Sequence, residues 1–219
     1  GYRDDGIQQT IKDDMDSRSM IKFDMIILDE QQDMTKLFFC LAIKIMRDNV
    51  INGVQICSFG DVFQNIYTYA GSDGRYLTFA NKLFPFYDGG RMWDSLRIST
   101  SYRITRQMAN FINVNLLKSE RLKAVKDGPN VKYVIADTFN TTYVYHEILK
   151  CIKLGYKPDD IFVLGVTLKK GSKPSPIGRL ENKLVMYGIP CHSSVSDDSA
   201  IDEEIIKGKV CFASFCQVK

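Results

Sequence analysis

The stretch IILDEQQD, residues 26–33, contains an apolar run that ends in two acidic residues, Asp29 and Glu30. A short, Ile-rich run such as 23–28 is typical of a strand buried in a parallel sheet. Such sheets bind ligands at the carboxyl ends of their strands. Asp29 is therefore a candidate ligand of Mg²⁺, and Glu30 a candidate base for the water that attacks a terminal phosphate. The alternative is a solvated acidic turn before a helix.

A second apolar run, VQICSF at 54–59, predicts another buried strand and ends at Gly60 and Asp61. If the two strands are neighbours, Asp61 and Gln64 lie beside the acidic pair. A glutamine amide donates to a phosphate oxygen and accepts from water, so Gln64 is a candidate sensor of the terminal phosphate. The alternative for Gln64 is a loop residue that caps its own backbone.

The third predicted strand, LRIST at 96–100, leads into SYRIT at 101–105. The planar fork of donors on Arg103 suits a phosphate and the charge that develops during its transfer. The ring of Tyr102 suits stacking on a base. The alternative for Arg103 is a surface ion pair.

Amphipathic helices alternate with apolar strands along the chain, and this alternation predicts an α/β fold with parallel sheets. The predicted helices are 35–48, with Thr35 as N-cap, 106–117, 143–154 and 177–187, the further strands are 131–136, 161–166 and 209–215, and 169–176 is a predicted flexible turn. Gly155 and Gly188 are expected to end two of these helices.

Composition limits the classes of protein further. The net charge of +3 neither indicates nor excludes a nucleic-acid partner. Six cysteines without a CxxC pair, together with two histidines, argue against a zinc site and favour buried free thiols in a reducing compartment. No apolar run reaches the length of about 18 residues needed to span a membrane. The start of the chain lacks a signal-peptide core and a Met, which predicts a fragment or a processed product.

Five elements in this order resemble the UvrD/Rep branch of superfamily 1 DNA helicases. The resemblance covers about 21–219, and its elements are DEQQD at 29–33 (motif II, Walker B), GDVFQNIYTYAGSD at 60–73 (motif III), SYRIT at 101–105 (motif IV), a strand, a helix and Gly-Ile-Pro within 161–192, and FASFCQVK at 212–219 (the start of motif V).

The resemblance implies two RecA-like motor lobes of the P-loop NTPase class. Residues 1–95 would form the C-terminal part of the first lobe, which is incomplete, and 96–219 a truncated second lobe. ATP and Mg²⁺ would be the cofactors. In the first lobe, the resemblance implies that Asp29 serves Mg²⁺, that Glu30 serves the catalytic water, and that Asp61 and Gln64 bind the nucleotide. Gln64 would couple the γ-phosphate of the nucleotide to closure of the motor. From the second lobe, Tyr102 would stack on adenine and Arg103 would reach the γ-phosphate.

The implied partner is single-stranded DNA, and the implied activity is ATP-driven movement along it in the 3′→5′ direction. Tyr67 and Tyr69 would stack on bases, although loop packing is an alternative for Tyr67. Ser214 and Lys219 would lie at the DNA-facing end of the last strand.

Several features depart from the family pattern. Ala70, Ser101 and Cys216 stand where the family commonly has Arg, Asn and His, which weakens the expected DNA contacts. The phosphate-binding loop G-x-x-x-x-G-K-[ST] is absent from this sequence, and motif VI is not reached. Both are expected in the parent gene, and this chain alone is not expected to hydrolyse ATP. The span 103–213 is short for the family's accessory insertion, which predicts a compact second lobe.

Two other functions stay open at this stage. A non-catalytic, helicase-like module that binds DNA or protein fits Ala70 and Cys216, but not the intact acidic pair. A Mg²⁺-dependent nuclease would need several carboxylates converging on metal, and Asp29, Glu30, Asp33 and Asp61 are available; it would leave Gln64 and Arg103 unexplained. The expected location is intracellular, in cytoplasm or nucleus, or in a virus factory or virion if the AT-rich residue usage reflects a viral genome.

Overall fold

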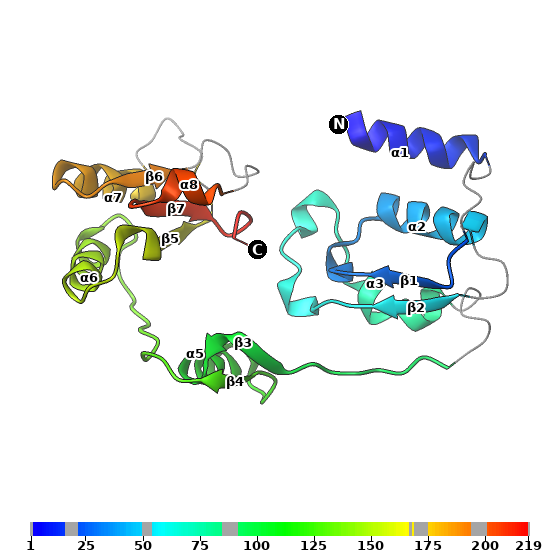
Figure 1. Cartoon of the computed structure of the whole chain (residues 1–219), viewed down its shortest axis with the longest axis horizontal. Helices are drawn as coiled ribbons and strands as arrows, with labels where there is room; N and C mark the ends of the chain where they lie inside the picture. Colours follow the sequence, from blue (N-terminus) through cyan, green and yellow to red (C-terminus); the bar gives the residue numbers. More distant parts are fainter. Residues whose placement is uncertain are drawn as a thin grey trace. The chain divides into compact units, whose positions relative to one another are not determined.

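The computed structural model of the chain describes residues 2–15, 22–49, 54–84, 92–166, 168, 175–193 and 201–218. The backbone divides into two compact units, Gly1–Ile98 and Ser99–Lys219. Both units combine short parallel strands with helices (Figure 1). The chain is therefore mixed α/β with parallel sheets, as predicted. The assignment of 1–95 and 96–219 to two RecA-like lobes stays a prediction.

In the described part of the first unit, the sheet consists of two parallel strands, β1 (Met25–Leu28) and β2 (Gln55–Ser58). Helix α2 (Lys36–Asn49) connects them, and the Thr35 hydroxyl accepts from the backbone N–H of Phe38 at 3.3 Å, which confirms the predicted N-cap. The other elements are α1 (Tyr2–Asp13), the 3₁₀ helices η1 (Gln31–Asp33), η2 (Val62–Gln64) and η3 (Thr68–Ala70), and the short helices α3 (Arg75–Thr78) and α4 (Ala80–Leu83).

The core of the first unit covers one face of this sheet. Met46, Ala80 and Phe84 are buried, and alternate residues of the sheet, such as Ile26, Leu28 and Ile56, pack against them. The intervening side chains of β1 are exposed, Met25 at 46% and Ile27 at 59%. The expectation of a fully buried strand is therefore wrong for this unit, because alternate side chains of a strand point to opposite faces and only one face is covered here.

A charged cluster joins the end of α1 to α2. The Lys44 side chain is 8% exposed and donates to the backbone carbonyl of Met15 and to the Asp48 carboxylate, both at 2.7 Å. Asp48 is 5% exposed at its side chain and also lies 3.4 Å from Arg47. Arg47 and Lys44 both pair with Asp14. Lys44 and Asp48 are thus a nearly buried pair of opposite charges. Removal of either partner would leave the other charge buried without compensation.

We predict that the first unit loses stability as the pH falls below about 4. The hydrogen bond from Lys44, together with Arg47, holds the pKa of the Asp48 carboxyl below its ordinary value. A carboxyl whose folded-state pKa lies below its unfolded value of about 3.9 contributes stability above that pH. The contribution is lost as the pH falls through the folded value. Urea unfolding of the chain near pH 7 and near pH 3, followed by circular dichroism, measures the loss.

The variant Lys44→Met serves as the comparison. It leaves the Asp48 carboxylate without its main partner and should cost about 2 kcal/mol near pH 7. It should also be less sensitive to acid than the wild type. An unchanged urea midpoint in this variant would show that the cluster does not stabilise the unit.

The described residues of the second unit form two separate parallel sheets. In the first, β3 (Thr100–Thr105) pairs with β4 (Lys123–Lys126), and α5 (Arg106–Phe111) continues as the π-helical turn η4 (Ile112–Leu117). In the second, β7 lies between β5 and β6. The elements around this sheet are α6 (Thr142–Lys153), η5 (Pro158–Asp160), β5 (Phe162–Gly165), α7 (Pro176–Met186), β6 (Cys191–Ser193), α8 (Glu203–Ile206) and β7 (Val210–Ser214).

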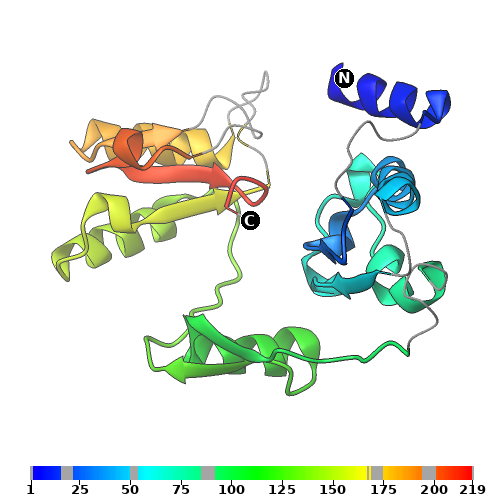
Figure 2. The ribbon, with the colours of Figure 1, turned by 45° about the vertical axis from the view of Figure 1, so that its right-hand side comes forward.

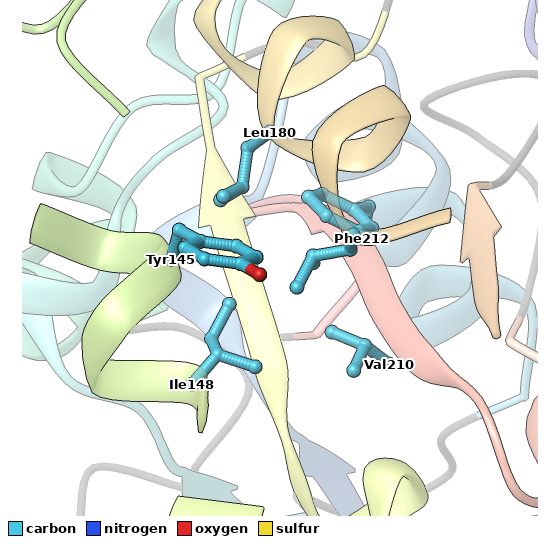
Figure 3. Close-up of a cluster of buried hydrophobic side chains, with 6 residues drawn as sticks. Tyr145, Ile148, Leu180, Val210 and Phe212 are labelled. Carbon is cyan, nitrogen blue, oxygen red and sulfur yellow. The ribbon is translucent and has the colours of Figure 1, made fainter. Parts of the chain in front are cut away.

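The core of the second unit forms around the central strand β7, all of whose residues are buried. Tyr145 and Ile148 from α6 and Leu180 from α7 point toward Val210 and Phe212 (Figure 3). Helix α7 begins where the Ser175 hydroxyl accepts from the Gly178 N–H at 3.0 Å. Central position and burial on both faces are expected of a parallel strand with helices on either side.

The structure confirms the helices predicted in the second unit and the strands predicted at 161–166 and 209–215, and it differs from the other predictions. The strand expected at 96–100 begins only at Thr100, and Leu96 and Ile98 are almost fully exposed. The expected strand 131–136 has no regular structure and no partner strand. The structure also contains β4, β6 and α8, which were not predicted; the sequence of β4, KAVK, is not an apolar run. Residues 169–174 of the predicted turn lie outside the described residues. Gly155 and Gly188 have φ values of 96° and 78°, as expected for glycines that end helices.

All six cysteines have free thiols, but only Cys211 is buried and the other five are half-buried, so the expectation of buried thiols holds for Cys211 alone. Burial raises the pKa of the Cys191 thiol to about 11, and it also raises the pKa of Cys211. These two thiols are therefore poor nucleophiles.

In the described parts of the chain, no helix combines the length and the apolar character needed to cross a bilayer.

Candidate functional site

The carboxyl ends of β1 and β2 lie side by side. Leu28 is in register with Ser58, and Figure 2 shows the two strands as neighbours. The contact continues past the strands, because the Phe59 N–H donates to the Leu28 carbonyl at 2.8 Å and the Gln31 N–H donates to the Phe59 carbonyl at 3.0 Å. The predicted adjacency of these strand ends is confirmed. The two polar segments that follow the strands start at one edge of the sheet.

The acidic pair turns away from the strand at this edge. Asp29 Oδ1 accepts from the backbone N–H of Glu30 at 2.9 Å, and Glu30 has left-handed backbone angles of φ 49° and ψ 38°. Residues other than glycine adopt this conformation rarely, and they often do so at functional sites. Both residues are exposed, and Glu30 makes no side-chain capping bond to η1. Both carboxylates are thus accessible to water or a cation.

Two buried glutamines follow the acidic pair, and only the amide of the second, Gln32, bonds residues of the candidate site. Gln31 Nε2 donates to the Tyr76 carbonyl at 3.0 Å, and Gln31 Oε1 accepts from the Ser58 hydroxyl. Gln32 Nε2 donates to Glu30 Oε2 at 2.5 Å, and Gln32 Oε1 accepts from the Asp61 N–H at 3.0 Å. Gln31 is 1% and Gln32 0% exposed. Gln32 therefore links the segment after β1 to the segment after β2.

Gly60 is required by this close approach of the two segments. A Cβ atom on Gly60 would lie 2.3 Å from Gln32 Oε1, 2.9 Å from the Leu77 side chain and 3.2 Å from the Gln31 backbone nitrogen. The first distance is far below van der Waals contact. Any side chain at position 60 would displace the Gln32 amide.

Asp61 organises the loop that carries Gln64. Its Oδ1 accepts from the Phe63 N–H at 3.0 Å as the N-cap of η2, and its Oδ2 accepts from Gln64 Nε2 at 3.2 Å. Gln64 is exposed. The Asp61 carboxylate thus has a local capping role, and the Gln64 amide is held at the same sheet edge as Glu30.

Two tyrosines follow in the same loop. The ring centroids of Tyr67 and Tyr69 are 6.3 Å apart and their planes are tilted by 53°. Tyr69 is 75% exposed, whereas Tyr67 is half-buried. The loop is anchored where Ser72 pairs with Thr35 and where the Asp73 N–H donates to the Met34 carbonyl at 3.0 Å. Tyr69 thus presents a flat ring to solvent from an anchored loop.

The remaining candidate residues belong to the second unit. Tyr102 is 75% exposed and Arg103 is exposed, and both lie on β3. The Arg103 N–H lies 3.3 Å from the Ser101 hydroxyl oxygen, to which it donates. Ser214 lies at the carboxyl end of β7, fully buried, and its N–H donates to Gln217 Oε1 at 2.8 Å. Lys219 lies outside the described residues. DNA contact by Ser214 and Lys219 stays a prediction.

Within the described residues, no three His, Cys, Asp or Glu side chains form a group that could hold a metal ion. A magnesium ion that is bound with a nucleotide normally has one or two carboxylates, phosphate oxygens and water as its ligands. Asp29 meets this smaller requirement, because its carboxylate is exposed at the sheet edge.

Comparison of the sequence with family models and with curated proteins gives no match.

Gln32, which bonds Glu30 and the Asp61 backbone, is a functional candidate that was not singled out from the sequence, whereas the neighbouring Gln31 bonds Tyr76 and Ser58 and has a structural role. Glutamine is usually exposed, so two adjacent glutamines give no signal of burial by themselves. Their position directly after the acidic pair is the only available hint. The structure adds that both amides are fully buried and bonded across the sheet edge.

Proposed function

We propose that this chain is part of an ATP-dependent DNA helicase or translocase that resembles the UvrD/Rep branch of superfamily 1 and moves 3′→5′ on single-stranded DNA. The observation that carries the proposal is the parallel pairing of β1 with β2. It brings Asp29, Glu30 and the loop of Gln64 to one edge of a parallel sheet, the edge at which such sheets bind ligands.

The hydrolytic chemistry would be divided among these three side chains. Mg²⁺ bound with ATP supplies charge neutralisation on the phosphates, and Asp29 would be its protein ligand. Glu30 would orient the attacking water and take its proton. Gln64 would donate its amide N–H to the γ-phosphate, a role that requires its present bond to Asp61 to rearrange. The exposure of all three side chains supports this division.

The second unit would contribute Arg103 and Tyr102. A guanidinium stabilises the charge on a transferring phosphoryl group, and a tyrosine ring stacks on adenine. Tyr69, with Tyr67 beside it, would stack on DNA bases, each stacked base contributing about 1–3 kcal/mol. Closing and opening of the motor during hydrolysis would then drive the movement along DNA.

Hydrolysis of ATP by the full-length protein tests the proposal. We expect phosphate release that requires Mg²⁺ and increases when single-stranded DNA is added. The present chain, expressed alone, should not turn over ATP, because it lacks a phosphate-binding loop. A full-length protein that binds single-stranded DNA without any ATP turnover would favour the non-catalytic module instead. Nuclease activity that persists in a Glu30→Gln variant would point to a different reaction.

A further inference from the structure

The Gln32 amide occupies a fully buried position between the two polar segments of the site. Its Nε2 donates to Glu30 Oε2 at 2.5 Å, and its Oε1 accepts from the Asp61 backbone N–H at 3.0 Å. The side chain is 0% exposed. A buried amide with both ends bonded is costly to rotate or remove, because either change leaves polar groups without partners.

Only one orientation of this amide satisfies both partners. A backbone N–H can only donate and an ionised carboxylate can only accept, so the amide oxygen must face Asp61 and the amide nitrogen must face Glu30. The absence of a side chain on Gly60 makes room for this arrangement, since a Cβ there would lie 2.3 Å from Gln32 Oε1. The amide therefore fixes one oxygen of the exposed Glu30 carboxylate.

The same line of hydrogen bonds continues into the second loop. Asp61 Oδ2 accepts from Gln64 Nε2 at 3.2 Å, and Asp61 Oδ1 caps η2. We propose that Gln32 is a positioning residue that holds the Glu30 carboxylate and couples it to the loop carrying Gln64. This inference rests on the proposed ATPase function. A displacement of Glu30 would be transmitted through Gln32 to the backbone of Asp61, and so to the γ-phosphate sensor.

The neighbouring glutamine provides a matched control. Gln31 is equally buried, but its amide bonds the Tyr76 carbonyl and the Ser58 hydroxyl. Replacing either glutamine by Met keeps the length of the side chain and removes both amide bonds. We therefore expect Gln32→Met and Gln31→Met to lower the melting temperature of the full-length protein by similar amounts, while only Gln32→Met impairs hydrolysis.

Steady-state ATP hydrolysis with single-stranded DNA separates the two roles. Gln32→Met should lower kcat about 100-fold, because loss of orientation at the reacting centre has effects of this size. The KM for ATP should stay within about threefold of the wild-type value, as expected for an interaction that matters in the transition state. Gln31→Met should keep a nearly normal kcat. Gln32→Glu, which retains an acceptor for Asp61 but places a second carboxylate against Glu30, should lose as much kcat as Gln32→Met.

Each other result would overturn the inference. Equal losses of kcat in Gln31→Met and Gln32→Met, or a normal kcat in Gln32→Met, would show that Gln32 only packs the site. In that case the wild-type protein is active and the proposed function stands. A wild-type full-length protein without ATP turnover would instead overturn the proposed function, and this inference with it.

Discussion

Replacing Arg103 by Ala in the full-length protein is expected to lower the kcat for ATP hydrolysis by about 10³–10⁵-fold, the range found for arginines that stabilise phosphoryl transfer. Arg103 is exposed on β3, and its backbone N–H donates to the Ser101 hydroxyl. The loss would arise in the transition state, when negative charge develops on the γ-phosphate. The rate of phosphate release at saturating Mg²⁺, ATP and single-stranded DNA measures it.

Arg106, three residues further along, is the matched control for this prediction. Its guanidinium donates to the Asp127 carboxylate at 2.5 Å and to the Val125 carbonyl at 2.9 Å, so it already has a structural role. Arg106→Ala should lower stability without a large change in kcat. Arg103→Lys should restore little activity, because an ammonium lacks the planar fork of a guanidinium. An Arg103→Ala protein with wild-type turnover would contradict the proposed role of Arg103 in hydrolysis.

Replacing Glu30 by Gln is expected to reduce turnover by about 10²–10⁴-fold, the usual contribution of a general base. A carboxamide oxygen at position 30 can still accept from Gln32 Nε2, so the link to Gln32 should survive. The lost property is the ability to take a proton from water. Binding of Mg²⁺ and ATP should be retained, and equilibrium binding of a fluorescent ATP analogue measures this directly.

Asp24 offers a control carboxylate next to the same strand. It precedes β1 at the opposite, amino end, where its backbone carbonyl accepts from the Gln55 N–H. Asp24→Asn should keep nearly normal turnover. If Asp24→Asn and Glu30→Gln were equally impaired, the loss would reflect general damage to β1, and the assignment of Glu30 as the base would be wrong.

In the first unit, short-range sequence patterns predict the two strands but not which side chains are buried. The apolar runs before Asp29 and Gly60 identify both strands and their shared edge, because parallel strands joined by a helix usually pair. The same patterns do not reveal burial. Met25 and Ile27 are apolar but exposed, whereas the polar Gln31 and Gln32 are buried. Burial depends on which side chains lie across the sheet edge, which periodicity along one segment does not encode.

In the second unit, the sequence pattern predicts one strand that does not form and misses another strand that does. The run 131–136 is apolar enough to predict a strand, yet it has no strand partner, whereas Lys123–Lys126 pairs with β3 despite its charged sequence. A strand forms where backbone hydrogen bonds find a neighbour, and β-propensity alone does not supply one. The helices α6 and α7 were predictable because their apolar faces repeat at helical spacing and each ends at a glycine with positive φ.

The most direct test is an experimental structure of the full-length protein with Mg²⁺ and a non-hydrolysable ATP analogue. The carboxyl ends of β1 and β2 should hold the nucleotide, with Asp29 bound to Mg²⁺ directly or through water, Glu30 facing the γ-phosphorus through a water molecule, and Gln64 turned from Asp61 toward the γ-phosphate. A nucleotide bound elsewhere, with Asp29 and Glu30 in contact with solvent alone, would contradict the proposed function.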